Sequence, residues 1–111
     1  MKTIISEEDV EAALTGLFDN AGEAAKRRAE RLYLEEYRKV VKAEEMGKSN
    51  ETAVGAQERH AYASEAYKSH LAAMRSAIEL DERARFKMTA YSATIDAWRT
   101  QESNQRAMGK I

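Results

Sequence analysis

Residues of one helical face recur at steps of three and four along the chain from His60 to Trp98. These steps average about 3.5 residues, so the stripe stays aimed at one partner along a left-handed supercoil. The pattern predicts a long helix that packs against another long element. The stripe consists of His60, Ala63, Tyr67, His70, Met74, Ala77, Asp81, Ala84, Met88, Tyr91, Ile95 and Trp98.

Helix start and stop signals divide the chain into three expected helices. Ser6 precedes three acidic residues, which is typical of an N-cap serine whose first turn supplies a capping-box-like partner. The segment DNAG at 19–22 indicates a stop and a restart. GKSNE at 47–51 is the clearest loop, where Ser49 or Asn50 could cap the following helix. The expected helices cover about residues 6–18, about 22–46 and about 52–108.

The composition favours the same architecture. Among 111 residues there is no proline, and glycine occurs only five times, so the usual punctuation of strands and turns is nearly missing. We therefore expect a single all-α domain over residues 1–111: a short N-terminal helix followed by a long helical hairpin with coiled-coil-like packing. The apolar faces expected to pack are Val10, Ala13, Leu14, Leu17 and Phe18 in the first helix, and Ala25, Ala29, Leu32, Tyr33, Tyr37, Val40 and Val41 in the second.

The expected helix lengths do not match. A third helix of about 50 residues extends about 75 Å, and the second helix covers only about half of it. Part of the stripe would then lack cover within the chain, which predicts self-association. The rival is a break near Asp81, the most polar point of the stripe, that lets the last segment fold back. The candidate interface residues are Met74, Met88, Tyr91, Ile95 and Trp98.

Cysteine is absent, which excludes a disulfide framework and a thiolate metal site and suits a reducing compartment. The start of the chain, MKTIISEEDV, lacks the apolar stretch of a signal peptide, and no segment approaches the length of a membrane span. We therefore expect a cytoplasmic protein with no membrane partner.

The net charge of -1 is unevenly distributed. Residues 1–23 carry a charge of -5, residues 24–82 are neutral, and residues 83–111 carry +4. Such polarity can steer an anionic partner to one end, or let the acidic end of one copy meet the basic end of another; alternatively, these charges belong to solvated helix faces.

No catalytic or metal-binding signature is present. His60 and His70 lie about 15 Å apart along a helix, too far to share a metal, and neither has another ligand at the spacing of a known motif. No glycine-rich phosphate loop or nucleophile elbow occurs. We therefore expect no cofactor and no enzymatic activity, with the histidines in packing roles or, as the minor alternative, at a pH-sensitive interface.

Basic and aromatic residues give a further hypothesis. Tyrosines could stack on bases while cations follow the phosphates, although their helical spacing also fits packing, and Tyr62 lies off the main stripe. The candidate nucleic-acid-binding residues are Arg27, Arg28, Arg31, Lys39 and Lys42.

The stretch KAEEMGKSNETAVGAQERHAYASEAYKSHLAAM, followed by IDAWRTQESNQRAM, resembles small helical accessory proteins of tailed phages, and its layout is similar to that of UvsY-type recombination mediators. The resemblance spans roughly residues 26–108. It implies a ring-forming protein of a bacterial host's cytoplasm that binds single-stranded DNA and helps to load a recombinase. This chain is less basic than such a role favours.

Two functions are therefore expected. The first is a non-enzymatic, homo-oligomeric phage-type accessory protein of DNA recombination or replication that binds single-stranded DNA, a recombinase or both. The alternative is a structural or adaptor protein, such as a virion-assembly component or an inhibitor of a host protein, that acts through protein contacts.

Overall fold

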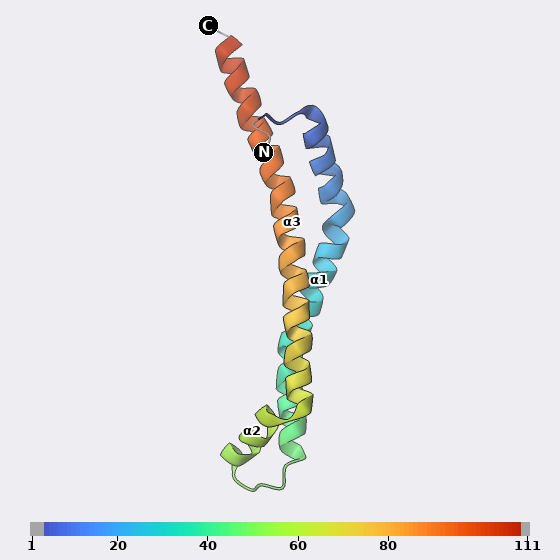
Figure 1. The fold of residues 1–111 in the computed structure, drawn as a ribbon, viewed down its shortest axis with the longest axis vertical. Helices are drawn as coiled ribbons and strands as arrows, with labels where there is room; N and C mark the ends of the chain where they lie inside the picture. Colours follow the sequence, from blue (N-terminus) through green and yellow to red (C-terminus); the bar gives the residue numbers. More distant parts are fainter. Residues whose placement is uncertain (1–3, 110–111) are drawn as a thin grey trace. The chain divides into compact units, whose positions relative to one another are not determined.

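The computed structural model describes residues 4–109, and this part of the chain contains three helices and no strand. The helices are α1 (Glu7–Gly47), α2 (Val54–Ala63) and α3 (Glu65–Gly109). Figure 1 shows the long helices α1 and α3 joined through the short α2. The predicted all-α class and the helical hairpin are confirmed.

The chain divides into two units. The terminal unit combines the residues up to Ala25 with those from Arg83 onward, and the central unit spans Lys26–Glu82. Each unit contains an α1 segment antiparallel to an α3 segment. In the terminal unit Ile5 meets Gln101 and Asn20 meets Lys87, and in the central unit Arg31 meets Asp81 and Leu34 meets His70.

The predicted start of the first helix is confirmed. The Ser6 backbone N–H donates to Asp9 Oδ2 at 2.9 Å, and the Asp9 N–H donates to Ser6 Oγ at 3.1 Å. This reciprocal pair is a capping box with Asp9 as the acidic partner. Just before it, the Gln101 side-chain amide accepts from the Ile5 N–H at 2.8 Å and donates to the Ile5 carbonyl at 2.6 Å.

The expected interruption at residues 19–22 is absent, because α1 continues through it. The Asn20 side chain donates to the Gly16 carbonyl at 2.8 Å and accepts from Lys87 at 3.2 Å, so this residue is satisfied inside the helix. Gly22 keeps a negative φ, as every described glycine does. An isolated glycine costs a helix only about 1 kcal/mol relative to alanine, which packing overrides here.

The single helix expected over about residues 52–108 is wrong, because Ser64 divides it into α2 and α3. The break lies earlier than the alternative near Asp81, and α3 runs uninterrupted through Asp81. Ser64 ends α2 with an extended backbone, and its hydroxyl donates to the Ala61 carbonyl at 2.6 Å. The same hydroxyl accepts the Tyr67 N–H at 3.2 Å, which caps α3. Thus one serine satisfies two helix ends.

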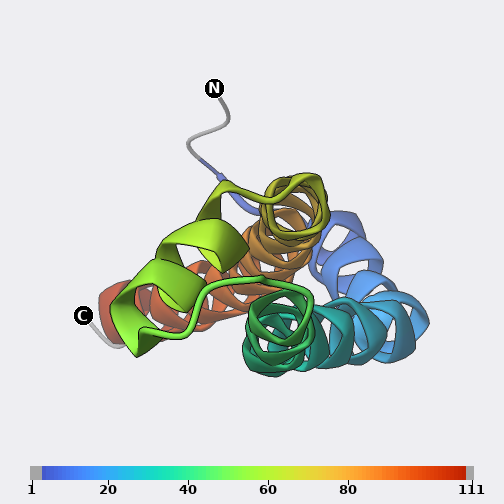
Figure 2. The same cartoon turned by 90° about the horizontal axis from the view of Figure 1, so that it is seen from below.

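The loop residues Ser49 and Asn50 do not cap α2, whose N-cap residue is Ala53 without a side-chain cap. Ser49 Oγ instead accepts the Glu51 N–H at 3.0 Å within the loop. In Figure 2, α2 lies to one side of the neighbouring α1 and α3 segments of the central unit. Two contacts place α2 against both long helices. Lys42 of α1 forms an ion pair with Glu58 of α2 at 3.6 Å, and the ring centres of Tyr62 in α2 and Tyr67 in α3 lie 5.1 Å apart.

Candidate interaction surfaces

The inward face of α3 follows the predicted stripe from Tyr67 to Trp98. In the central unit Tyr67, Met74, Ala77 and Asp81 are buried, and in the terminal unit Ala84, Met88, Tyr91, Ile95 and Trp98 are partly buried. His60 and Ala63 are exposed, because the chain changes direction at Ser64.

The expected lack of cover over Met74, Met88, Tyr91, Ile95 and Trp98 is therefore wrong, because α1 is one helix of 41 residues and supplies that cover. Tyr91 packs closely on Gly16 in the terminal unit, where a Cβ in place of the glycine hydrogen would lie 2.4 Å from a Tyr91 ring atom. Glycine at this position lets the Tyr91 ring rest on the backbone of α1.

The inward face of α1 in the central unit is more polar than expected. Arg31, Leu34, Val41 and Glu45 are buried or partly buried, whereas Leu32, Tyr33, Tyr37 and Val40 are exposed. The predicted packing face was thus wrong for most of its large residues. The same holds in the terminal unit for Leu14 and for Phe18, which is 82% exposed.

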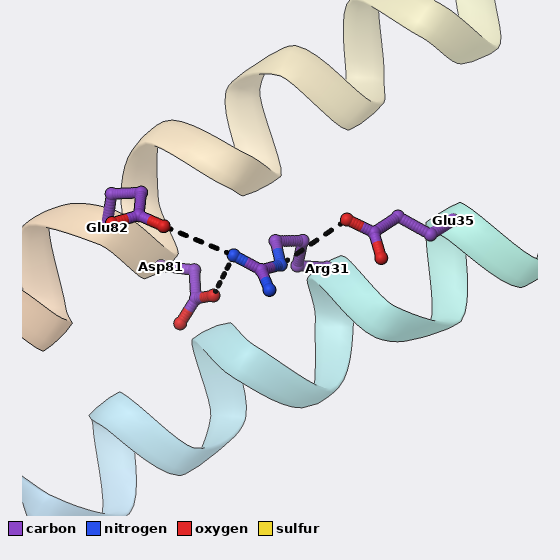
Figure 3. Close-up of polar contacts among 4 residues, drawn as sticks. All are labelled: Arg31, Glu35, Asp81 and Glu82. Carbon is purple, nitrogen blue, oxygen red and sulfur yellow. Dashed lines mark hydrogen bonds and ion pairs between the residues drawn. The ribbon is translucent and has the colours of Figure 1, made fainter.

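A cluster of charges explains how a polar face can turn inward. Arg31 Nη1 lies 2.9 Å from Asp81 Oδ2 and 3.3 Å from Glu82 Oε1, and its Nε lies 3.4 Å from Glu35 Oε1 (Figure 3). The Nε contact has no hydrogen-bond geometry, so it is a charge contact only. Asp81 is 5% exposed, and Arg31 is the charge that compensates its buried carboxylate.

Arg31 is therefore committed to the fold. Its side chain is 22% exposed and contacts three carboxylates from two helices (Figure 3). A phosphate that recruited this guanidinium would leave Asp81 buried without a partner, a cost of several kcal/mol. The structure thus places one of the five candidate nucleic-acid-binding residues inside the hairpin.

The other four candidates differ in accessibility. Arg27 is partly buried, and Arg28 is exposed. Lys39 is exposed and pairs with Glu36 at 3.2 Å, a surface contact of small energy. Lys42 is partly buried between α1 and α2. The five residues therefore differ in how readily each could reach a phosphate.

Lys42 belongs to a different basic site. It lines a hollow of about 300 Å³ together with Arg38, Lys39, Tyr62 and Tyr67. Lys42 Nζ lies 4.9 Å from the centre of the Tyr62 ring, a cation–π distance. A side-chain hydrogen bond with Tyr62, followed by the charge of Glu58, raises the pKa of Lys42 above its usual 10.5 in spite of partial burial. Three cations and an aromatic wall make this the described site best suited to an anion with a planar ring.

The two histidines have separate surroundings. His60 is exposed on α2, whereas the Nε2 atom of His70 lies 2.6 Å from the Leu34 carbonyl and its ring lies 5.9 Å from that of Tyr37. Within residues 4–109, no group of three or more His, Cys, Asp or Glu side chains is placed to hold a metal ion. Both histidines are accounted for as packing or surface residues.

An aromatic surface lies on one flank of α1 in the central unit, where the Tyr37 ring also borders His70 of α3. The rings of Tyr33 and Tyr37 stack at 5.7 Å, and Tyr33 is 61% exposed. Val40 continues the same helical face and is also exposed. Sequence reasoning placed these residues toward the partner helix, because it read the more apolar side of α1 as the inward one.

The acidic N-terminal segment and the basic C-terminal segment both belong to the terminal unit. Its α1 segment begins with Glu7, Glu8 and Asp9, and its α3 segment carries Arg83, Arg85 and Lys87. Lys87 reaches Asn20 across this unit. Ile5, just before the acidic turn, instead meets Gln101, so the acidic turn and the basic residues 83–87 lie at opposite ends of this unit.

Comparison of this chain with protein-family models, with curated proteins and with solved structures finds no match. Among residues 4–109, no helix has both the length and the apolar character that crossing a bilayer requires.

Proposed function

We propose that this chain is a non-enzymatic structural or adaptor protein that works by self-association of its helices. One observation carries the proposal: a flank of α1 displays Tyr33, Tyr37 and Val40, while three of the five buried hydrophobic residues within 4–109 are alanines. Exposed aromatic residues at helical spacing are typical of protein interfaces, since they gain most when water is removed from them.

The size of the core supports the same proposal. The buried hydrophobic residues among those described are Ala13, Ala61, Tyr67, Met74 and Ala77, and three of them are alanines. Alanine buries little area, so the fully buried positions contribute little hydrophobic stabilisation. Association would add the burial that one chain does not provide.

Light scattering between about 10 and 100 µM tests the proposal. A micromolar association corresponds to about 8 kcal/mol, so the mass should rise with concentration in this range above the 12.5 kDa of one chain. A constant mass of one chain throughout would contradict self-association. Titration with oligo(dT) at low salt, on the same samples, separates an assembly role from DNA binding.

A second candidate function, the binding of single-stranded DNA, is favoured by the hollow lined by Arg38, Lys39, Lys42, Tyr62 and Tyr67. Cations beside an exposed ring fit a phosphate and its neighbouring base without regard to sequence. This hypothesis keeps two of the five expected residues, Lys39 and Lys42. Binding of a recombinase stays a prediction, and no described residue specifically supports it.

The DNA hypothesis predicts that Tyr62→Ala weakens oligo(dT) binding about 5- to 150-fold, the usual value of stacking one base. Arg28→Ala is the control, because this exposed arginine does not line the hollow. Equal binding by the unsubstituted chain and both variants, or no binding at low salt, would contradict the hypothesis.

A further inference from the structure

A second heptad stripe runs along one flank of α1 in the central unit, beside the inward face. Its members are separated by steps of four, three, four, three and four, so they share one helical face. All of them are exposed, and they lie within a single uninterrupted helix; the Tyr37 ring, which is 36% exposed, also lies 5.9 Å from that of His70 of α3. This outer stripe consists of Lys26, Glu30, Tyr33, Tyr37, Val40 and Glu44.

The outer stripe is complementary to itself when reversed. If a second copy lies antiparallel with the two-fold axis between the levels of Tyr33 and Tyr37, Tyr33 meets Tyr37 of the second copy and Lys26 meets Glu44 of the second copy. Each contact then occurs twice, as in any isologous interface. A parallel arrangement would instead bring Lys26 against Lys26 and Glu44 against Glu44, so charge selects the antiparallel direction.

We propose that a second copy of this chain docks antiparallel on the outer stripe, with the stacked Tyr33 and Tyr37 rings at its centre and Lys26–Glu44 ion pairs at both ends. The inference rests on the proposed self-association and names its interface. From Lys26 to Glu44 the contact spans about 27 Å of helix. One such stripe buries less than the roughly 800 Å² per partner of a standard interface, so the dimer should be of micromolar strength.

The level between the aromatic centre and the charged ends is the weakest part of this arrangement. There Glu30 faces Val40 of the second copy, so a carboxylate opposes an apolar side chain. Glu30→Leu should therefore tighten the dimer at least about tenfold, because each copy buries additional apolar area. A weaker dimer in this variant would contradict the register.

Charge reversal tests the ends. Lys26→Glu and Glu44→Lys should each raise the dissociation constant about tenfold at low salt, because two attractive contacts become repulsive at once. The double variant should restore the affinity. Arg28→Glu is the matched control: it reverses the same charge on the same helix, but this exposed residue lies off the stripe and does not line the hollow.

Disulfide trapping tests the direction, and the chain contains no cysteine that could interfere. When Tyr33→Cys and Tyr37→Cys proteins are mixed and oxidised, the antiparallel register predicts the mixed disulfide, which a tag on one protein resolves. If disulfides form predominantly between two copies of the same variant, the antiparallel arrangement is overturned. Circular dichroism should show that each variant keeps its helical content.

The outcomes separate this inference from the proposed function. An unsubstituted chain that associates, while charge reversal and its rescue have no effect, overturns the outer stripe as the interface and leaves self-association standing. An unsubstituted chain that stays monomeric overturns both. Association that weakens with each reversal and recovers in the double variant supports both.

Discussion

At the scale of the residue, Gly16 is the position where a single methyl group matters most. A Cβ there would lie 2.4 Å from the Tyr91 ring, closer than van der Waals contact allows. Since the ring belongs to the opposite helix of the terminal unit, the conflict can be relieved only by moving that ring or separating the helices.

Gly16→Ala should therefore destabilise the protein by about 1–3 kcal/mol, the usual cost of overpacking. Gly22→Ala is the matched control, because nothing lies within 4 Å of a Cβ at this helical position. It should stabilise by about 0.5–1 kcal/mol through helix propensity. Urea unfolding of the two variants should move in opposite directions; a stabilised Gly16→Ala would mean that Tyr91 does not rest on Gly16.

Loss of the Arg31 side chain should lower the stability of the central unit. Arg31→Met removes the compensating charge of the buried Asp81 and should cost about 3–5 kcal/mol. Arg31→Met combined with Asp81→Leu should recover most of that loss, because an apolar pair replaces the ion pair. Chemical denaturation of the single and double variants measures the coupling.

Lys39→Met provides the comparison, since its exposed pair with Glu36 is worth less than about 1 kcal/mol. If Arg31→Met left stability unchanged but weakened DNA binding, Arg31 would be a phosphate ligand and the assignment above would be wrong.

At the scale of the element, the junction at Ser64 sets the direction of α2 relative to the start of α3. Its hydroxyl donates to Ala61 and accepts from Tyr67, so one side chain ends one helix and begins the next. A Ser–Glu pair opens α3, as another opens α1 at Ser6. That shared signal could have located the junction, although no glycine or proline marks it.

Ser64→Ala should cost about 1 kcal/mol, the usual value of an N-cap. Ser76→Ala on the exposed surface of α3 should be neutral or slightly stabilising, since alanine is the better helix former. Thermal unfolding distinguishes the two. Equal melting temperatures would show that the cap contributes nothing.

The elements also show what a single sequence can reveal. The inward face of α3 was predictable from Tyr67 to Trp98 because its spacing is regular over many turns. The inward face of α1 was not, because its inward positions include Arg27 and Arg31, and the latter is paired with a carboxylate 50 residues away. A local reading turns the more apolar side inward, and here that side faces solvent.

The candidate sites were predictable to a similar extent. Lys39 and Lys42 were identified from charge alone, whereas Arg38 and Tyr62 join them only because α2 returns to α1 after the loop. The outer stripe was visible in the sequence as Tyr33, Tyr37 and Val40 but was expected to be covered by the partner helix; only Tyr37 borders it, through His70.

At the scale of the whole molecule, stability and association should separate. Trp98 is partly buried on the inward face of α3, and a buried tryptophan loses about 3–5 kcal/mol on truncation. Trp98→Ala should therefore lower the melting temperature and leave the mass of the folded protein unchanged. Tyr33→Ala should instead lower the mass toward that of one chain and leave the stability of the single chain nearly unchanged. Light scattering and thermal melts on both variants check this, and a mass change confined to Trp98→Ala would restore the inward stripe as the interface.

The antiparallel pairing also fixes an order of folding. The contacts of the central unit join residues 36 and 51 positions apart, whereas those of the terminal unit join residues 67 and 96 positions apart. Closing a longer loop costs more chain entropy, so the contacts near the turn form more readily than those near the ends. The hairpin should therefore fold from its turn toward its termini. The two hydrogen bonds between the Gln101 side chain and the Ile5 backbone are then the last of these contacts to form and the first to break.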